Sequence, residues 1–105
     1  MNSSNGKCSH WQAWHDRMPG SKPTLYVTGK CVFPTPGYSV KLEPVEISVD
    51  PPGVLELNRI VEAPTDLAIQ VLTEVEVRYS QDTDASYQQV NILPENVTIP
   101  VREVS

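Results

Sequence analysis

The chain has 105 residues, a formal net charge of −5, a hydrophobic share of 39%, ten prolines and five glycines. This length fits one domain with a modest core, and the negative charge disfavours nucleic-acid binding, which needs a basic surface. No stretch is long and apolar enough to cross a membrane, and no signal peptide is visible, so we expect a cytoplasmic location, with an exported form as the alternative.

Residues 10–18 are predicted as the one helix. Ser9 is placed to cap it, and bulky side chains follow at a spacing that gathers them on one helical face. These side chains are Trp11, Trp14, His15 and Met18. We expect residues 1–20 to form an arm that contains this short helix, and residues 21–105 to form a single β-sandwich domain.

Alternating apolar and polar residues predict strands in the rest of the chain. The first covers residues 24–33, where Gly29 interrupts the inward row and indicates a bulge or a close backbone approach. The second begins at Tyr38, and its apolar positions change parity after Pro44. Such a change indicates a bulge or a strand that crosses from one sheet to another.

The third predicted strand covers residues 54–61, with Leu55 and Leu57 as its core pair. The clearest strand pattern is 67–79, where every odd position except Thr73 is apolar or aromatic. Since side chains of a strand alternate between its two faces, this pattern predicts one dry face and one wet face.

The C-terminal part predicts a polar hairpin loop at 80–86, a strand at 87–93, a turn at 94–96 and a last strand at 97–101. Pro100 lacks a backbone donor, so we expect this last strand at a sheet edge. The whole pattern predicts an all-β fold: a small immunoglobulin-like β-sandwich of six to seven antiparallel strands. A small β-barrel is the alternative.

The thiols and imidazoles of the chain are Cys8, His10, His15 and Cys31. They are candidates for a tetrahedral zinc site, although their spacing matches no familiar zinc motif and the two histidines would diverge by about 140° on a helix. A Cys8–Cys31 disulfide is a second interpretation, disfavoured by a reducing compartment. We favour two unpaired thiols and expect no metal and no cofactor.

No catalytic motif is evident. The chain has no G-x-S-x-G, and the acidic pair Asp82 and Asp84 lacks the lysine and the further acids of a phosphotransferase site. Glu74 and Glu76 occupy outward strand positions, where solvated carboxylates rarely have the shifted pKa that acid–base catalysis needs. We therefore expect a protein without enzymatic activity.

Aromatic residues cluster with basic ones in the first third of the chain. Exposed Trp and Tyr beside Arg are typical of protein interfaces and sugar platforms, whereas tryptophans of a docked helix would simply be core, which we favour. We expect an interaction or structural domain that binds another protein or itself, with a homodimer through a sheet edge. The alternative is a small-ligand or metal-binding module that uses the N-terminal Cys/His/Trp cluster. The candidate interaction residues are Trp11, Trp14, Tyr26, Glu74, Glu76 and Arg78.

Overall fold

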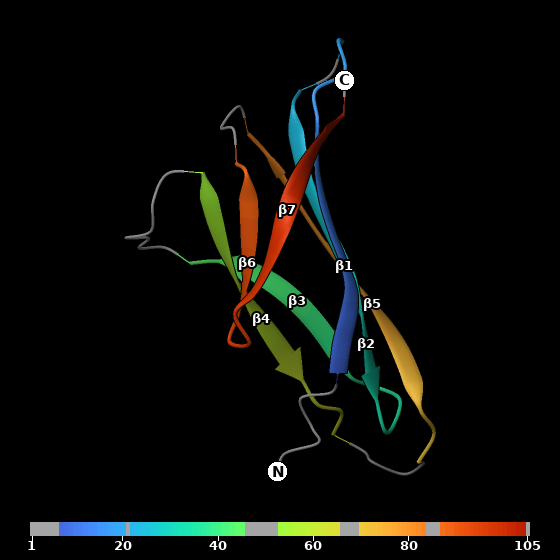
Figure 1. Cartoon of the computed structure of the whole chain (residues 1–105). Coiled ribbons are helices and arrows are strands. Elements are labelled where there is room, and N and C mark those ends of the chain that lie inside the picture. Colours follow the sequence, from blue (N-terminus) through green and yellow to red (C-terminus); the bar gives the residue numbers. More distant parts are fainter. Residues whose placement is uncertain (1–6, 21, 46–52, 66–69, 84–86, 105) are drawn as a thin grey trace.

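The computed structural model describes residues 7–20, 22–45, 53–65, 70–83 and 87–104, and it is all-β, as predicted (Figure 1). Within these ranges no residue is helical, and no helix could cross a membrane. The strands are β1 (Lys7–Asp16), β2 (Thr24–Phe33), β3 (Ser39–Pro44), β4 (Val54–Glu62), β5 (Thr73–Asp82), β6 (Gln89–Leu93) and β7 (Val97–Val104).

The seven strands form one sheet in the order β3-β4-β6-β7-β1-β2-β5. Its two end strands, β3 and β5, approach each other with Cα atoms within 8 Å, so the sheet is nearly closed. This arrangement fits the barrel alternative, and the immunoglobulin-like sandwich is not confirmed. The β1–β7 and β4–β6 pairs are parallel, so the expectation of an entirely antiparallel fold is wrong.

β7 joins the two halves of the sheet. Its residues 97–100 pair with β6 and its residues 101–104 pair with β1, and Figure 1 shows this strand crossing from one neighbour to the other. β7 is therefore a central strand, and the prediction of an edge position is wrong. Pro100 is tolerated because it lies where the β6 pairing ends and the β1 pairing begins, so its missing N–H interrupts neither ladder's interior.

The predicted helix is wrong, because Lys7–Asp16 forms β1 between β7 and β2. A bulge in β1 sets His10 and Trp11 opposite the single residue Gly29 of β2, and His10 has a φ of 58°. The extra residue shifts the inward positions from even to odd numbers. After the bulge, Trp11 and His15 face inward and Trp14 faces outward, so the bulky residues that resembled one helical face lie on both faces of the strand.

Trp11 packs against Gly29 on the inner face of the sheet. A Cβ on Gly29 would overlap Cε3 and Cζ3 of the indole and would lie 2.8 Å from its Cδ2. Only a glycine leaves room for the ring here. The predicted close approach at Gly29 is thus confirmed, whereas the bulge lies in the partner strand β1, opposite this residue.

The core lies between the two halves of the sheet. Predicted inward residues of β2 and the Leu55–Leu57 pair of β4 are buried. Burying a side chain of this size contributes about 1.5–3 kcal/mol. The fully buried members with the largest aliphatic or aromatic side chains are Leu25, Val27, Phe33, Leu57, Val77, Val90 and Ile92.

β5 begins later than predicted. It starts at Thr73, and the preceding Val71 and Leu72 are 52% and 78% exposed and belong to no strand. Three other expectations fall wholly or partly outside the described residues: the parity change after Pro44, the first residues of the 67–79 strand, and the tip of the 80–86 loop.

Candidate functional site

Cys8 and Cys31 form a disulfide between neighbouring strands. They lie directly opposite each other in the β1–β2 ladder, and their sulfurs are bonded. The favoured prediction of two unpaired thiols is therefore wrong. The reason is the antiparallel pairing of the two strands, which makes residues 23 apart in sequence direct cross-strand neighbours.

The two histidines lie apart and in different surroundings. His10 is exposed in the bulge, with its Nδ1 2.9 Å from Ser9 Oγ. His15 is buried, and its Nε2 donates a hydrogen bond of 2.9 Å to the backbone oxygen of Thr83. Nδ1 of His15 is buried and has no hydrogen-bond partner among the described residues. No group of three or more potential metal ligands occurs among the described residues.

Arg59 is a buried charge that the sequence analysis missed. It continues the inward row of β4, its Nη1 lies 3.3 Å from Cys8 Sγ, and its guanidinium pairs with Glu95 of the β6–β7 turn. A buried guanidinium needs such partners to offset its loss of hydration. Arg59 therefore connects the β6–β7 turn, through Glu95, with the end of the sheet that holds the disulfide, through Cys8. This is a structural role. Its position two residues after Leu57 is the signal that could have identified it.

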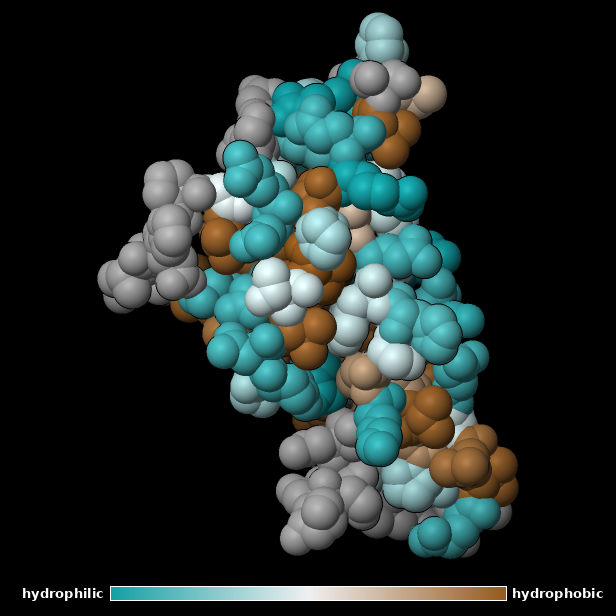
Figure 2. Space-filling model, in the orientation of Figure 1, coloured by the Kyte–Doolittle hydropathy of each residue, from teal (hydrophilic) through white to brown (hydrophobic). Residues whose placement is uncertain are grey.

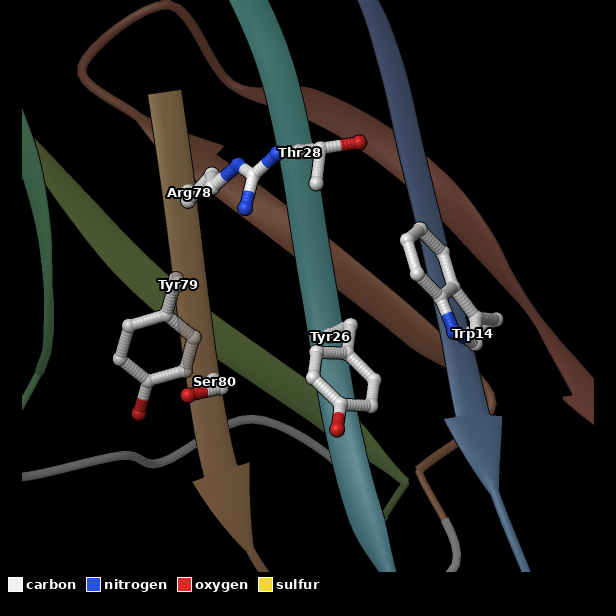
Figure 3. Close-up of a pocket in the computed structure, with 6 residues that line it drawn as sticks. All are labelled: Trp14, Tyr26, Thr28, Arg78, Tyr79 and Ser80. Carbon is white, nitrogen blue, oxygen red and sulfur yellow. The ribbon is translucent and has the colours of Figure 1, made fainter. Parts of the chain in front are cut away.

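The outer face of β1 and β2 carries an aromatic pair. Trp14 and Tyr26 are directly opposite in the β1–β2 register, with ring centroids 5.4 Å apart and ring planes 24° apart. Figure 3 shows the two rings side by side above their strands. The next residue along this row is Ser80 of β5, which pairs with Tyr26. Strand pairing thus assembles a row that runs across three strands.

This pair borders a hollow of about 370 Å³, called the Trp14 hollow here. Arg78 of β5 extends toward Thr28 of β2, and Tyr79 lies on the far side of β5 from Tyr26 (Figure 3). The side chain of Arg78 is 76% exposed, and its Nη2 lies 3.5 Å from a carboxylate oxygen of Glu76. The lining residues are Trp14, Tyr26, Thr28, Arg78, Tyr79 and Ser80.

Tyr79 has a perturbed phenol at the edge of this hollow. Burial raises its pKa above the ordinary tyrosine value, and the neighbouring Tyr87 adds to the effect. Its hydroxyl donates a hydrogen bond of 3.0 Å to Gln81. The phenol is therefore neutral at physiological pH and serves as a hydrogen-bonding group.

A second hollow, of about 400 Å³, lies at the adjoining end of the β2–β5 pair. Asp82 pairs with Thr24, one outward position beyond the Tyr26–Ser80 pair, and it accepts a hydrogen bond of 3.1 Å from the Thr24 hydroxyl. We call it the Asp82 hollow. Its lining residues are Lys22, Pro23, Asp82 and Thr83.

The predicted interaction residues divide into two groups. Trp14, Tyr26 and Arg78 meet at the Trp14 hollow, whereas Trp11 faces the inside of the sheet. Glu74 and Glu76 are exposed on the same outer face of β5, outside the lining. Thr28 and Ser80 were not predicted, although their outward parity with Tyr26 and Arg78 could have identified them.

The Trp14 hollow offers aromatic faces, hydroxyl groups and a guanidinium. These groups stack and donate or accept hydrogen bonds, which suits them to hold a ligand. Comparison of the chain with descriptions of known protein families, with curated proteins and with solved structures gave no match.

Proposed function

We propose that the protein is a non-enzymatic binding domain whose partner contacts the outer face of β1, β2 and β5. The observation that carries this proposal is the Trp14–Tyr26 pair beside the exposed Arg78. Tryptophan, tyrosine and arginine dominate the binding energy of known interfaces. The aromatic rings present large rigid surfaces at a small cost in conformational entropy, and the guanidinium adds five hydrogen-bond donors in a planar arrangement.

A purely structural role for the aromatic pair makes a different prediction. Cross-strand aromatic pairs stabilise a sheet by about 0.2–1 kcal/mol relative to alanine. Trp14 and Tyr26 point away from the core, so their removal costs the fold little compared with the loss of a buried ring. A structural pair would therefore affect stability alone, whereas a binding pair affects retention of a ligand by a folded protein.

The test compares wild type, Trp14→Ala and Arg78→Gln on arrays of peptides and glycans. Lys41→Gln is the matched control, because it removes one exposed positive charge from β3, outside the proposed face. We expect a set of ligands that wild type and the control retain and the two other variants lose. The same binding profile for all four proteins would refute the proposal.

Self-association through β5 is a second candidate function. β5 ends the sheet: β3 approaches it, but among the described residues no strand is hydrogen-bonded to its other side. Exposed Val71 and Leu72 precede it, and Figure 2 shows an apolar area beside the start of this strand. An antiparallel pairing of two copies centred on Val77 sets Glu76 of each copy opposite Arg78 of the other. Opposite charges at such positions stabilise a strand pair.

Sedimentation at several concentrations tests this second candidate. Arg78→Glu should weaken a dimer, and adding Glu76→Arg should restore it, because the two charges are then exchanged. Glu74→Arg is the control, since residue 74 would lie opposite Ser80 and lose no ion pair. A wild-type protein that stays monomeric at all concentrations contradicts the candidate.

A further inference from the structure

The Trp14 hollow combines flat apolar surfaces with a polar rim. Trp14 and Tyr26 stack with their ring centroids 5.4 Å apart and their planes 24° apart, and together they form an aromatic platform on the outer face of the sheet (Figure 3). The hydroxyls of Thr28 and Ser80 flank this platform. A pyranose ring has the matching chemistry: a face of C–H groups that can lie on an aromatic ring, and a rim of hydroxyls that both donate and accept.

Charges of both signs border the platform. Arg78 lies on one side of Ser80 along β5 and Asp82 on the other, all on the outward face. A cationic ligand would meet the guanidinium, and a polyanion would meet the carboxylate and a domain with a net charge of −5. An uncharged polyol can use both groups, because its hydroxyls accept from the guanidinium and donate to the carboxylate. Asp82 accepts one bond from Thr24 and retains further acceptor sites.

The two hollows follow each other along the β2–β5 pair. Their volumes are about 370 and 400 Å³, each at the lower end of the roughly 300–1,000 Å³ of small-molecule sites. Successive outward residues of a strand are about 7 Å apart, so the Tyr26 and Thr24 positions lie one such step apart. Such a succession suits a chain of linked rings better than a single compact molecule.

We infer that the outer face of the β2–β5 pair binds an uncharged oligosaccharide, a ligand assignment that rests on the proposed binding function. One sugar ring stacks on Tyr26 and Trp14, with its hydroxyls toward Thr28, Ser80 and Arg78. The chain continues toward Asp82 in the second hollow.

Titrations of isotope-labelled protein, followed by nuclear magnetic resonance, test this inference. The probes are short uncharged oligosaccharides of glucose, xylose, mannose and N-acetylglucosamine. We expect at least one probe to shift the indole N–H signal of Trp14 and the backbone signals of β2 and β5. The indole signal of Trp11 is the internal control, because its ring packs on the inner face. This measurement uses wild type, so it does not depend on whether a variant folds.

Variants then measure the contribution of each group. Trp14→Ala should weaken binding at least about fivefold, the lower bound for loss of a stacking ring. Tyr26→Phe keeps the ring and should retain most of the affinity, whereas Tyr26→Ala should not. Arg78→Gln should weaken binding, and Lys41→Gln, with the same change of charge outside this face, should leave it unchanged.

The remaining outcomes show whether the sugar assignment, the assigned site or the proposed binding function is wrong. If no uncharged sugar shifts any signal at about 10 mM, while array ligands of another class still require Trp14, the sugar assignment is wrong and the binding function stands. Sugar binding that neither shifts the Trp14 signal nor responds to Trp14→Ala overturns the assigned site. An array profile that is the same for wild type and the Trp14 and Arg78 variants refutes both.

Discussion

Replacing Gly29 by alanine should destabilise the protein through the ring of Trp11. The φ of Gly29 is not in the left-handed region, so its backbone accepts alanine. The obstacle is the indole, whose Cε3 and Cζ3 would overlap the new methyl group. The ring would have to leave its place on the inner face, where it packs against the core.

Two opposing effects set the change in the free energy of unfolding. Overpacking of this kind costs about 1–3 kcal/mol, and alanine in place of a strand glycine gains about 0.5–1 kcal/mol. The free energy of unfolding of Gly29→Ala should therefore fall by about 1–2 kcal/mol. For a domain of this size, this loss lowers the melting temperature by roughly 5–15 °C.

Urea denaturation followed by circular dichroism measures the effect in a double-mutant cycle. In a Trp11→Ala background the obstacle is gone, so Gly29→Ala should become neutral or slightly stabilising. This reversal of sign distinguishes a clash with the ring from a general intolerance of the strand. An unchanged stability of the Gly29→Ala single variant, or equal losses in both backgrounds, would refute the reasoning.

Three further predictions concern stability. Replacing Cys8 and Cys31 by serine should lower the free energy of unfolding by about 3 kcal/mol, because the cross-link restricts the unfolded chain between residues 23 apart. Equal urea denaturation curves of the wild type with and without reductant would contradict this. Glu95→Gln should lower the free energy of unfolding by about 2 kcal/mol, which is more than Arg59→Met should lower it. The reason is that the Arg59 side chain is only 2% exposed and would be left without its carboxylate. Thermal melts that show the reverse order would contradict this. Burial raises the pKa of Tyr79, so the folded state holds the phenolic proton more tightly than the unfolded state does. The contribution of this proton to the free energy of unfolding is complete below pH about 10, and it is lost as pH rises through the folded-state pKa. Urea midpoints measured across this range should fall less for Tyr79→Phe than for wild type.

The inward rows of β2, β4 and β5 could be predicted because they depend on local alternation. A strand exposes one face to the core, and the sequence records this directly in Leu25, Val27, Leu57 and Val77. No knowledge of the neighbouring strands is needed for such a prediction. The all-β fold follows from the same local signal.

The first strand could not be predicted in this way. Its bulge at His10 and Trp11 depends on Gly29, a residue of another strand that leaves room for the indole ring. Without that partner in view, the spacing of Trp11, Trp14 and His15 matches one face of an amphipathic helix, whereas the strand divides these residues between its two faces. A tertiary contact therefore decides the local structure here.

The candidate site depends on strand register in the same manner. Trp14 meets Tyr26, and Tyr26 meets Ser80, only because three strands pair with particular offsets. An offset of one residue would turn each of these side chains to the other face. The sequence indicated the residue types of a binding surface, but their assembly into one hollow required the pairing of β1 with β2 and of β2 with β5.

The central position of β7 has a consequence for the order of folding during synthesis. The ribosome adds roughly 5–20 residues per second from the N-terminal end, so β1 and β6 are both made before the strand that lies between them. Until β7 emerges, each of these strands has an unpaired edge, which can pair with other chains. The two halves of the sheet can join only when β7 arrives, and its pairing with β1 joins segments far apart in sequence, which slows folding. The nascent chain is therefore most prone to aggregation just before β7 is released, when most of its strands exist and the one that connects the two halves does not.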